Sequence, residues 1–189
     1  KAAAVRVAGL TEWQVLVDHG ELKRGQNVLI HAACGGVGTF VVQFAKWKGA
    51  YVIGTTSKEN IDFVKQLGAD EVIDYKNEKF ENILKDIDLV IDLIGGDTQK
   101  RSLKVLKKGG RLITTVKPEN QEAAKEKNIH IEGFLAQSIP EELEQIKQLI
   151  DSGKVKPVVA AILPLKDAAK AHKLSEEGHI RGKIVLQVV

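Results

Sequence analysis

Sulfur is scarce in this chain, which has one cysteine, Cys34, and no methionine in 189 residues. A single thiol cannot form a disulfide within the chain, so the composition favours a reducing compartment and we expect a cytoplasmic protein. Cys34 can be interpreted as a reactive thiol or, more simply, as a small side chain required beside a helix start. Since the sequence starts at Lys1 and lacks methionine, we expect it to be a portion of a longer protein.

Long apolar segments and an excess of charge are also missing. No run approaches the roughly 20 apolar residues of a membrane-spanning helix, and no basic-then-apolar leader opens the chain, so we expect no membrane partner. The formal net charge is only +3 and the lysines are interleaved with acids, which argues against a nucleic-acid partner. With 43% hydrophobic and 28% charged residues, the composition is that of a globular protein.

A glycine-rich segment follows the first apolar run. Residues 28–30 predict a buried strand and residues 39–46 predict a helix. Residues 31–38 connect them, and this connection ends in Gly35, Gly36, Val37 and Gly38. Small residues let the backbone approach a diphosphate, and the amides of a helix N-terminus attract it. A second strand at residues 50–55 completes the β-α-β unit that the motif requires, although Ala33 replaces the first glycine of G-x-G-x-x-G. A glycine-rich turn in another parallel α/β protein is the alternative.

Strands and helices alternate along most of the chain. Further strands are predicted at residues 71–74, 87–93, 110–115 and 129–135, and helices at residues 60–67, 98–106 and 140–150. Several strands are continuous in Val, Ile and Leu, which is typical of a parallel sheet covered by helices on both faces. The expected fold class is α/β, a doubly wound parallel sheet (Rossmann) with strand order 3-2-1-4-5-6.

The two ends of the chain carry other signals. Thr11 and Gln14 fit a capping box, which predicts a helix from Thr11 to about Gly20. Residues 154–189 do not continue the alternation, because an extended segment and a helix precede an apolar strand at residues 183–189. That strand needs a partner outside the six-stranded sheet. We therefore expect a nucleotide-binding domain at residues 1–153 and a return arm at residues 154–189.

The end of the second strand predicts the cofactor. An enzyme that prefers NAD usually has Asp or Glu there to bind the ribose 2'-hydroxyl. This strand ends in Thr55, Thr56, Ser57 and Lys58, so hydroxyls and a cation replace the acid and favour the 2'-phosphate of NADP. Glu59 weakens this argument, and Lys58 can also be a solvated lysine at a helix start, so NAD stays open as the alternative.

Six segments of the chain resemble the zinc-independent quinone oxidoreductase branch of the medium-chain dehydrogenase/reductase superfamily. They are GLT-x-W at residues 9–13, IHAA-x-GGVG at 30–38, GT-x-S at 54–57, LGAD-x-VIDY at 67–75, D-x-x-GG at 92–96 and GKIV at 182–185. The resemblance implies an NADPH-dependent reductase of quinones or α,β-unsaturated carbonyls. Members of this branch are commonly dimers, and residues 129–135 form a sheet edge suited to such a contact, although the sequence leaves the oligomeric state open. The resemblance also implies an N-terminal GroES-like catalytic domain before this region, on which residues 154–189 would pack. The chain alone is then expected to bind NADP with little or no turnover, so we assign no catalytic residue.

Carried over by position, the resemblance implies a cofactor site along the carboxyl ends of the strands. The diphosphate would lie on the backbone of Gly36, Val37 and Gly38 beside Gly35, with Lys183 near the phosphates. The 2'-phosphate would lie near Ser57, Lys58 and Tyr75, the adenine near Ile94, and the nicotinamide end near Thr115, Phe134 and Leu135. Thr55 is also expected to bind the cofactor. For two of these residues the assignment to the cofactor site is open to another interpretation. Lys58 precedes the family's usual lysine position, and Tyr75 can simply cover the sheet edge.

Metal binding and two rival functions complete the expectations. One cysteine and five histidines without a close pair predict no metal site, and His31 is interpreted as a hydrogen-bonded core residue. An S-adenosylmethionine-dependent methyltransferase also has a glycine-rich loop after its first strand, but it would want an acid at the end of strand two. A dinucleotide-binding or oligomerisation module without catalysis is the second rival.

Overall fold

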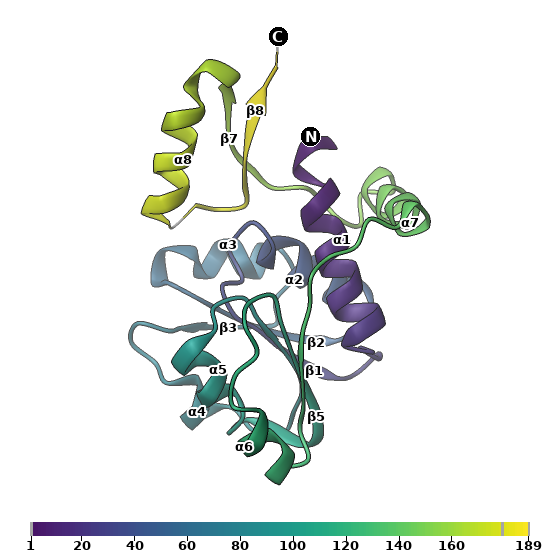
Figure 1. The fold of residues 1–189 in the computed structure, drawn as a ribbon, viewed down its shortest axis with the longest axis vertical. Coiled ribbons are helices and arrows are strands. Elements are labelled where there is room, and N and C mark those ends of the chain that lie inside the picture. The colour runs from purple at the N-terminus through teal and green to yellow at the C-terminus, as the bar shows by residue number, and fades with distance from the viewer. Residues whose placement is uncertain (1, 179, 189) are drawn as a thin grey trace.

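The computed structural model describes residues 2–178 and 180–188, and a parallel sheet of six strands forms its centre (Figure 1). The strands are β1 (Asn27–Ile30), β2 (Tyr51–Thr56), β3 (Glu71–Asp74), β4 (Ile87–Asp92), β5 (Leu106–Thr114) and β6 (His130–Gly133). Their order is β3-β2-β1-β4-β5-β6, which confirms the predicted topology. The order reverses between β1 and β4, where a crevice opens at the carboxyl ends of the strands.

Helices cover both faces of this sheet. They are α1 (Arg6–Gln14), α2 (Gly38–Trp47), α3 (Ile61–Gln66), α4 (Phe80–Ile83), α5 (Gly96–Ser102) and α6 (Gln121–Glu126), while α7 (Pro140–Asp151) packs against α1. Successive residues of β1 enter different cores: Val28 and Ile30 pack in a cluster with residues of α1, α2 and α7, whereas Leu29 packs in a cluster with Phe80 and Ala124. A strand buried on both faces is apolar at successive positions, as β1 is from Val28 to Ile30.

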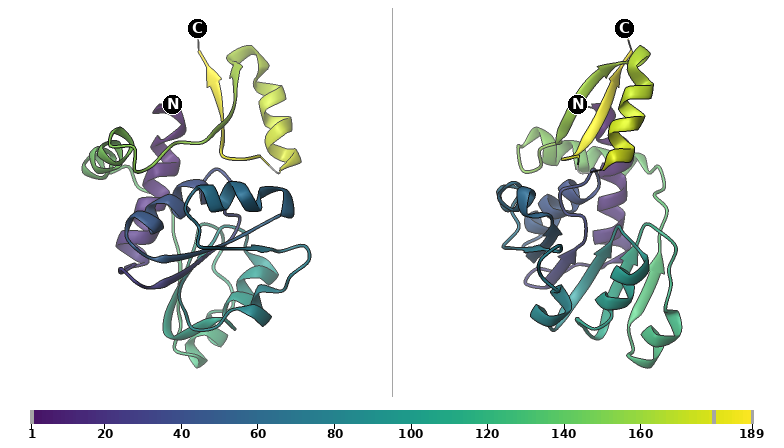
Figure 2. Two further views of the ribbon diagram at one scale, coloured as in Figure 1. Left: turned by 180° about the vertical axis from the view of Figure 1, so that it is seen from behind. Right: turned by 90° about the vertical axis from the view of Figure 1, so that its left-hand side faces the viewer.

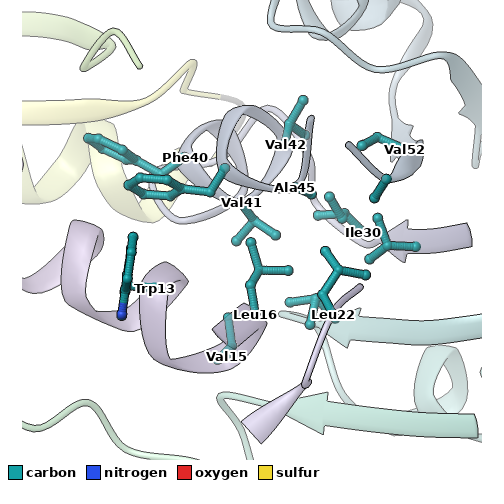
Figure 3. Packing of buried hydrophobic residues seen from close by; sticks show 14 of the residues in the cluster. Trp13, Val15, Leu16, Leu22, Ile30, Phe40, Val41, Val42, Ala45 and Val52 are labelled. Carbon is teal, nitrogen blue, oxygen red and sulfur yellow. The ribbon is translucent and has the colours of Figure 1, made fainter. Parts of the chain in front are cut away.

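The larger core lies between α1, α2 and the sheet (Figure 3). Leu16 and Val41 are fully buried there, and the ring of Trp13 stands edge-on to Phe44 at 6.2 Å. Each fully buried side chain of this size contributes roughly 1.5–3 kcal/mol through burial. This packing fixes α2, whose N-terminus forms one side of the crevice.

The first helix starts earlier than the sequence predicts. It begins at Arg6, and Thr11 lies buried in its interior with no side-chain cap at the helix start, so the capping-box prediction is wrong. The helix continues as a π-helical segment, Val15–His19. Leu10 and Trp13 pack into the core, and this packing sets the start of the helix more strongly than the polar signal at Thr11.

Other helix boundaries differ from the predicted ones where the apolar pattern is compatible with both a helix and a strand. The helix predicted at residues 98–106 ends at Ser102, because Val105 and Leu106 enter the smaller core and Leu106 pairs with Ile87 as part of β5. Helices α4 and α6 were not predicted. Each is short, and each contributes a single buried apolar residue to that core, which gives no detectable period.

The C-terminal arm forms a separate two-stranded parallel sheet. Strand β8 (Lys183–Gln187) pairs with β7 (Val159–Pro164), and α8 (Ala168–Glu177) connects them through the short turn Leu165–Asp167. The partner of the last strand is therefore within the arm. Residue 189, part of the predicted strand, lies outside the described residues. Figure 2 shows the arm standing above α2 and α3, beside the carboxyl ends of the central strands.

Candidate cofactor-binding site

The glycine-rich segment forms a tight loop between β1 and α2. Gly35 N donates to Ala32 O at 2.9 Å, and Thr39 N donates to Gly35 O at 3.0 Å. In the described part of the chain, the amides of Gly36 and Val37 donate no hydrogen bond. These two donors stand at the positive end of α2, an arrangement that suits an anion.

Residues 38 and 36 are glycine for different structural reasons. A Cβ on Gly38 would lie 2.2 Å from Ala32 O, so the buried Gly38 lets α2 pack against the loop. A Cβ on Gly36 would lie 2.8 Å from Lys183 Cδ, because the Lys183 side chain crosses this glycine. The absence of a side chain at Gly36 thus leaves room for the Lys183 side chain to lie against the loop backbone.

A cavity of about 460 Å³ lies beside the loop at the carboxyl ends of β1, β2, β3 and β4. Five residues predicted to bind the cofactor line it: Gly35, Thr55, Ser57, Tyr75 and Ile94. Its wall also contains Thr56, one of the hydroxyl residues at the end of the second strand, and eight residues that were not predicted to bind the cofactor: His31, Ala32, Cys34, Asn60, Phe80, Thr98, Arg101 and Ile180. Asn60 is the N-cap residue of α3 and lies three residues after Ser57. Because Asn is favoured at this position, its place at the start of a predicted helix is the signal that could have drawn attention to it.

A second cavity, of about 510 Å³, lies on the other side of the loop, against the arm. Gly35, Gly36 and Lys183 line it, and Gly35 and Ile180 line both cavities. Gly182 N donates to Cys34 O at 3.0 Å, which holds the start of β8 against the loop. The two cavities therefore form neighbouring parts of one groove around the free amides.

Four predicted residues lie elsewhere. Lys58 is exposed and Thr115 is half-buried, and neither lines a described cavity. Phe134 and Leu135 line a third cavity of about 530 Å³ next to His19, whose ring lies 4.7 Å from that of Phe134. Leu135 is 87% exposed.

His31 is a neutral member of the first cavity wall. Its Nδ1 lies 3.0 Å from Thr55 Oγ1 and its Nε2 lies 2.9 Å from Ser102 Oγ. Burial lowers the pKa of His31 to about 4, with the Asp92 charge opposing that effect. The ring therefore orients Thr55 and supplies no positive charge for a phosphate.

Asp92, at the end of β4, fixes the turn that presents Ile94. Its Oδ1 accepts hydrogen bonds from the amides of Ile94 and Gly95 at 3.0 and 2.9 Å, and its Oδ2 accepts from Gln99 and Thr114. A fully buried carboxylate with four donors is well satisfied. Ile94 is 54% exposed and faces the cavity, as expected for a residue that packs against a flat base.

The residues present do not fit a zinc site. Among residues 2–178 and 180–188, no group of three or more His, Cys, Asp or Glu side chains could hold a metal ion. Both ring nitrogens of His31 already have hydroxyl partners, so His31 is not available as a ligand. In the same residues, no helix is long and apolar enough to cross a bilayer.

A parallel α/β sheet with free amides at the start of α2, the helix that follows β1, and with a groove at the switch point defines a dinucleotide-binding domain of the Rossmann type. Residues 67–186 match the family model described as zinc-binding dehydrogenase, and the chain belongs to this family of medium-chain dehydrogenases/reductases.

Comparisons with individual proteins agree with this assignment. The chain is 32% identical to the mitochondrial NAD(P)H oxidoreductase RTN4IP1 of Danio rerio, with 100% of the chain and 57% of the relative aligned. Its structure matches the quinone oxidoreductase of Coxiella burnetii with a TM-score of 0.93 and 41% identity, over 100% of the chain and 60% of the relative. It matches Escherichia coli quinone oxidoreductase complexed with NADPH with a TM-score of 0.90 and 32% identity, over 99% and 64%. The chain thus spans somewhat more than half the length of these relatives.

Proposed function

We propose that this chain is the nucleotide-binding portion of an NADPH-dependent oxidoreductase that transfers hydride to quinones or α,β-unsaturated carbonyls. The observation that carries the proposal is the pair of free amides at Gly36 and Val37, in a loop whose Gly35 lines both cavities at the switch point of the sheet. The printed names of the relatives support it, since they are NAD(P)H and quinone oxidoreductases, one of them complexed with NADPH.

In this proposal each part of the groove holds one part of the cofactor. The amides of Gly36 and Val37, with the Lys183 ammonium, bind the diphosphate. Ser57, at the end of β2, and Tyr75 bind the ribose 2'-phosphate, while Ile94 packs against the adenine. The bound cofactor supplies the hydride, and the residues of this chain orient it and exclude water.

The acceptor would be bound largely by a further domain. We propose that residues 1–153 form the NADP-binding domain and that the arm of residues 154–189 packs on a GroES-like catalytic domain. The arm exposes large apolar side chains, with Ile162 at 60%, Leu165 at 51% and Val188 at 75%, and the chain spans 57–64% of the relatives named above. Hydride transfer then rests on proximity, so we assign no catalytic side chain here.

Three further properties are proposed on narrower grounds. We propose zinc-independent chemistry from the resemblance to the quinone oxidoreductase branch, and the site residues of this chain, which do not fit a zinc ion, support it for this domain. A homodimer can form along β6, which pairs with β5 alone among the described strands. We also propose a cytoplasmic location, which the single cysteine favours, whereas the RTN4IP1 relative is named mitochondrial. Sedimentation tests the second property, and fractionation of the source cells tests the third.

Calorimetric titration with NADPH, NADH and S-adenosylmethionine tests the cofactor. We expect saturable binding of NADPH, weaker binding of NADH and none of S-adenosylmethionine. Binding of S-adenosylmethionine would favour the methyltransferase alternative. A non-catalytic binding module predicts NADPH binding without quinone or enone reduction even when a catalytic domain is supplied, and NADPH oxidation measured with and without that domain separates the two.

A further inference from the structure

Three side chains connect the arm to the first cavity. Arg181 Nε donates to Asn60 Oδ1 at 2.6 Å, and Asn60 Nδ2 donates to Ser57 Oγ at 3.1 Å. Asn60 and Ser57 line the cavity and are almost fully buried, whereas Arg181 is exposed and does not line it. Any effect of Arg181 on the cavity can therefore pass through Asn60.

The direction of these hydrogen bonds is fixed by the groups involved. Arg181 can only donate, so Asn60 must turn its carbonyl oxygen toward Arg181 and its NH₂ group toward Ser57. Because Ser57 Oγ accepts from Asn60, its own proton is left to donate to another group. A phosphate oxygen accepts and carries charge, so it gains more from such a donor than a ribose hydroxyl does.

Arg181 itself is firmly held. Its Nη2 donates to Glu59 O at 2.6 Å, and its guanidinium lies 5.4 Å from the ring centroid of Phe63. The next residue, Gly182, is bonded to the loop through Cys34 O. These contacts keep the donor at Nε aimed at Asn60.

We propose that Arg181 is a positioning residue for cofactor selection, which acts through Asn60 to direct the Ser57 proton toward the ribose 2'-phosphate and so favours NADPH over NADH. This inference rests on the proposed function. It assigns part of the cofactor preference to the arm, outside the strand that bears Ser57.

The test compares Arg181→Gln with Arg181→Met by calorimetric titration of NADPH and NADH. Glutamine places an N–H donor where arginine has Nε but removes the charge, whereas methionine removes both. We expect Arg181→Met to weaken NADPH binding about tenfold and to leave NADH binding nearly unchanged, and we expect Arg181→Gln to retain most of the NADPH affinity. In a Ser57→Ala background, Arg181→Met should have no further effect. Lys170→Met removes a positive charge from an exposed site on the same arm and serves as the control.

Other outcomes overturn the inference. Equal losses in Arg181→Gln and Arg181→Met would show that the charge acts on the phosphate directly. Equal losses of NADPH and NADH affinity would show that Arg181 only holds the arm in place. Additive effects of Arg181→Met and Ser57→Ala would break the link through Asn60. Absence of binding of both nucleotides by the unmodified chain would instead refute the proposed function, and this inference with it.

Discussion

The Lys183 side chain lies across Gly36, with Nζ 3.1 Å from the position that a Cβ on Gly36 would take. Because the atoms met by that Cβ belong to the far end of a flexible side chain, Gly36→Ala can be accommodated by moving Lys183. We expect the thermal midpoint to change by no more than about 3 °C and the Kd for NADPH to rise about tenfold. Differential scanning fluorimetry and titration measure both. A large fall in the midpoint with unchanged affinity would contradict this assignment of Gly36.

Gly38→Ala should behave in the opposite way. The added Cβ would meet backbone atoms, Ala32 O at 2.2 Å and Ala33 Cα at 2.8 Å, which cannot move without displacing α2 from the loop. We expect a loss of about 1–3 kcal/mol or more in the free energy of unfolding, measured in urea. Gly35→Ala, whose Cβ would meet Ala32 O at 3.2 Å, is the control and should cost less.

His31 makes stability depend on pH on the acid side. Its pKa is about 4 in the folded chain and near 6.5 when unfolded, so the unfolded chain binds the extra proton between these values. Stability is therefore full above pH 6.5 and falls as the pH drops toward 4. We expect about 2 kcal/mol less at pH 5 than at pH 7.5 in urea unfolding. His31→Gln should lack this part of the pH slope, and an unchanged slope would contradict the neutral, buried state of His31.

Glu12 acts in the opposite sense. It is fully buried on α1, neither carboxyl oxygen has a hydrogen-bond partner in the described residues, and burial raises the pKa of Glu12 well above its usual range. The folded chain then binds the extra proton, so stability is full below pH 4.5 and is lost as the pH rises through the folded pKa.

Glu12→Gln should therefore stabilise the chain at pH 8 by roughly 1–3 kcal/mol, with an advantage that shrinks toward pH 4.5. Urea unfolding at several pH values measures the difference. Glu141→Gln, at an exposed site, is the control and should change little. A constant difference at every pH would show that the carboxyl group does not change its ionisation on unfolding.

Ser57 and Lys58 are neighbours with different surroundings, so their variants separate two explanations of NADP preference. Ser57 lines the cavity, whereas Lys58 is exposed and does not. We expect Ser57→Ala to weaken NADPH binding about tenfold and Lys58→Met to weaken it less than about threefold. Titration in low and moderate salt checks both. A larger loss for Lys58→Met would restore the cation at the end of β2 as the main phosphate ligand.

The sequence predicted the topology because each strand carries its own signal. In β1 every residue from Val28 to Ile30 is apolar, and the glycines that follow can serve only a tight turn into a helix. The six-stranded order follows from repeating this unit twice. The start of α1 could not be predicted, since it depends on contacts with α2 and α7 that are distant in sequence.

The site was predictable where it follows strand ends, and not where separate elements meet. Ser57, Tyr75 and Ile94 each follow a strand and were found for that reason. Asn60 and Arg181 are brought together only by the folded arm, and their contact leaves no pattern in the sequence. The pairing of β8 with β7 was also missed. Pro157 and Pro164 interrupt the apolar pattern of the segment that contains β7, so that segment did not read as a strand.

The bond from Gly182 N to Cys34 O has a consequence for biosynthesis. When translation has reached the end of β6, all strands of the central sheet have been synthesised. Ile180 and Lys183, which line the second cavity, have not yet been translated at that stage. If the groove binds the cofactor as proposed, the contact of Lys183 with the diphosphate forms only after the arm is translated, so a partly synthesised sheet would gain less stabilisation from the cofactor than the complete chain.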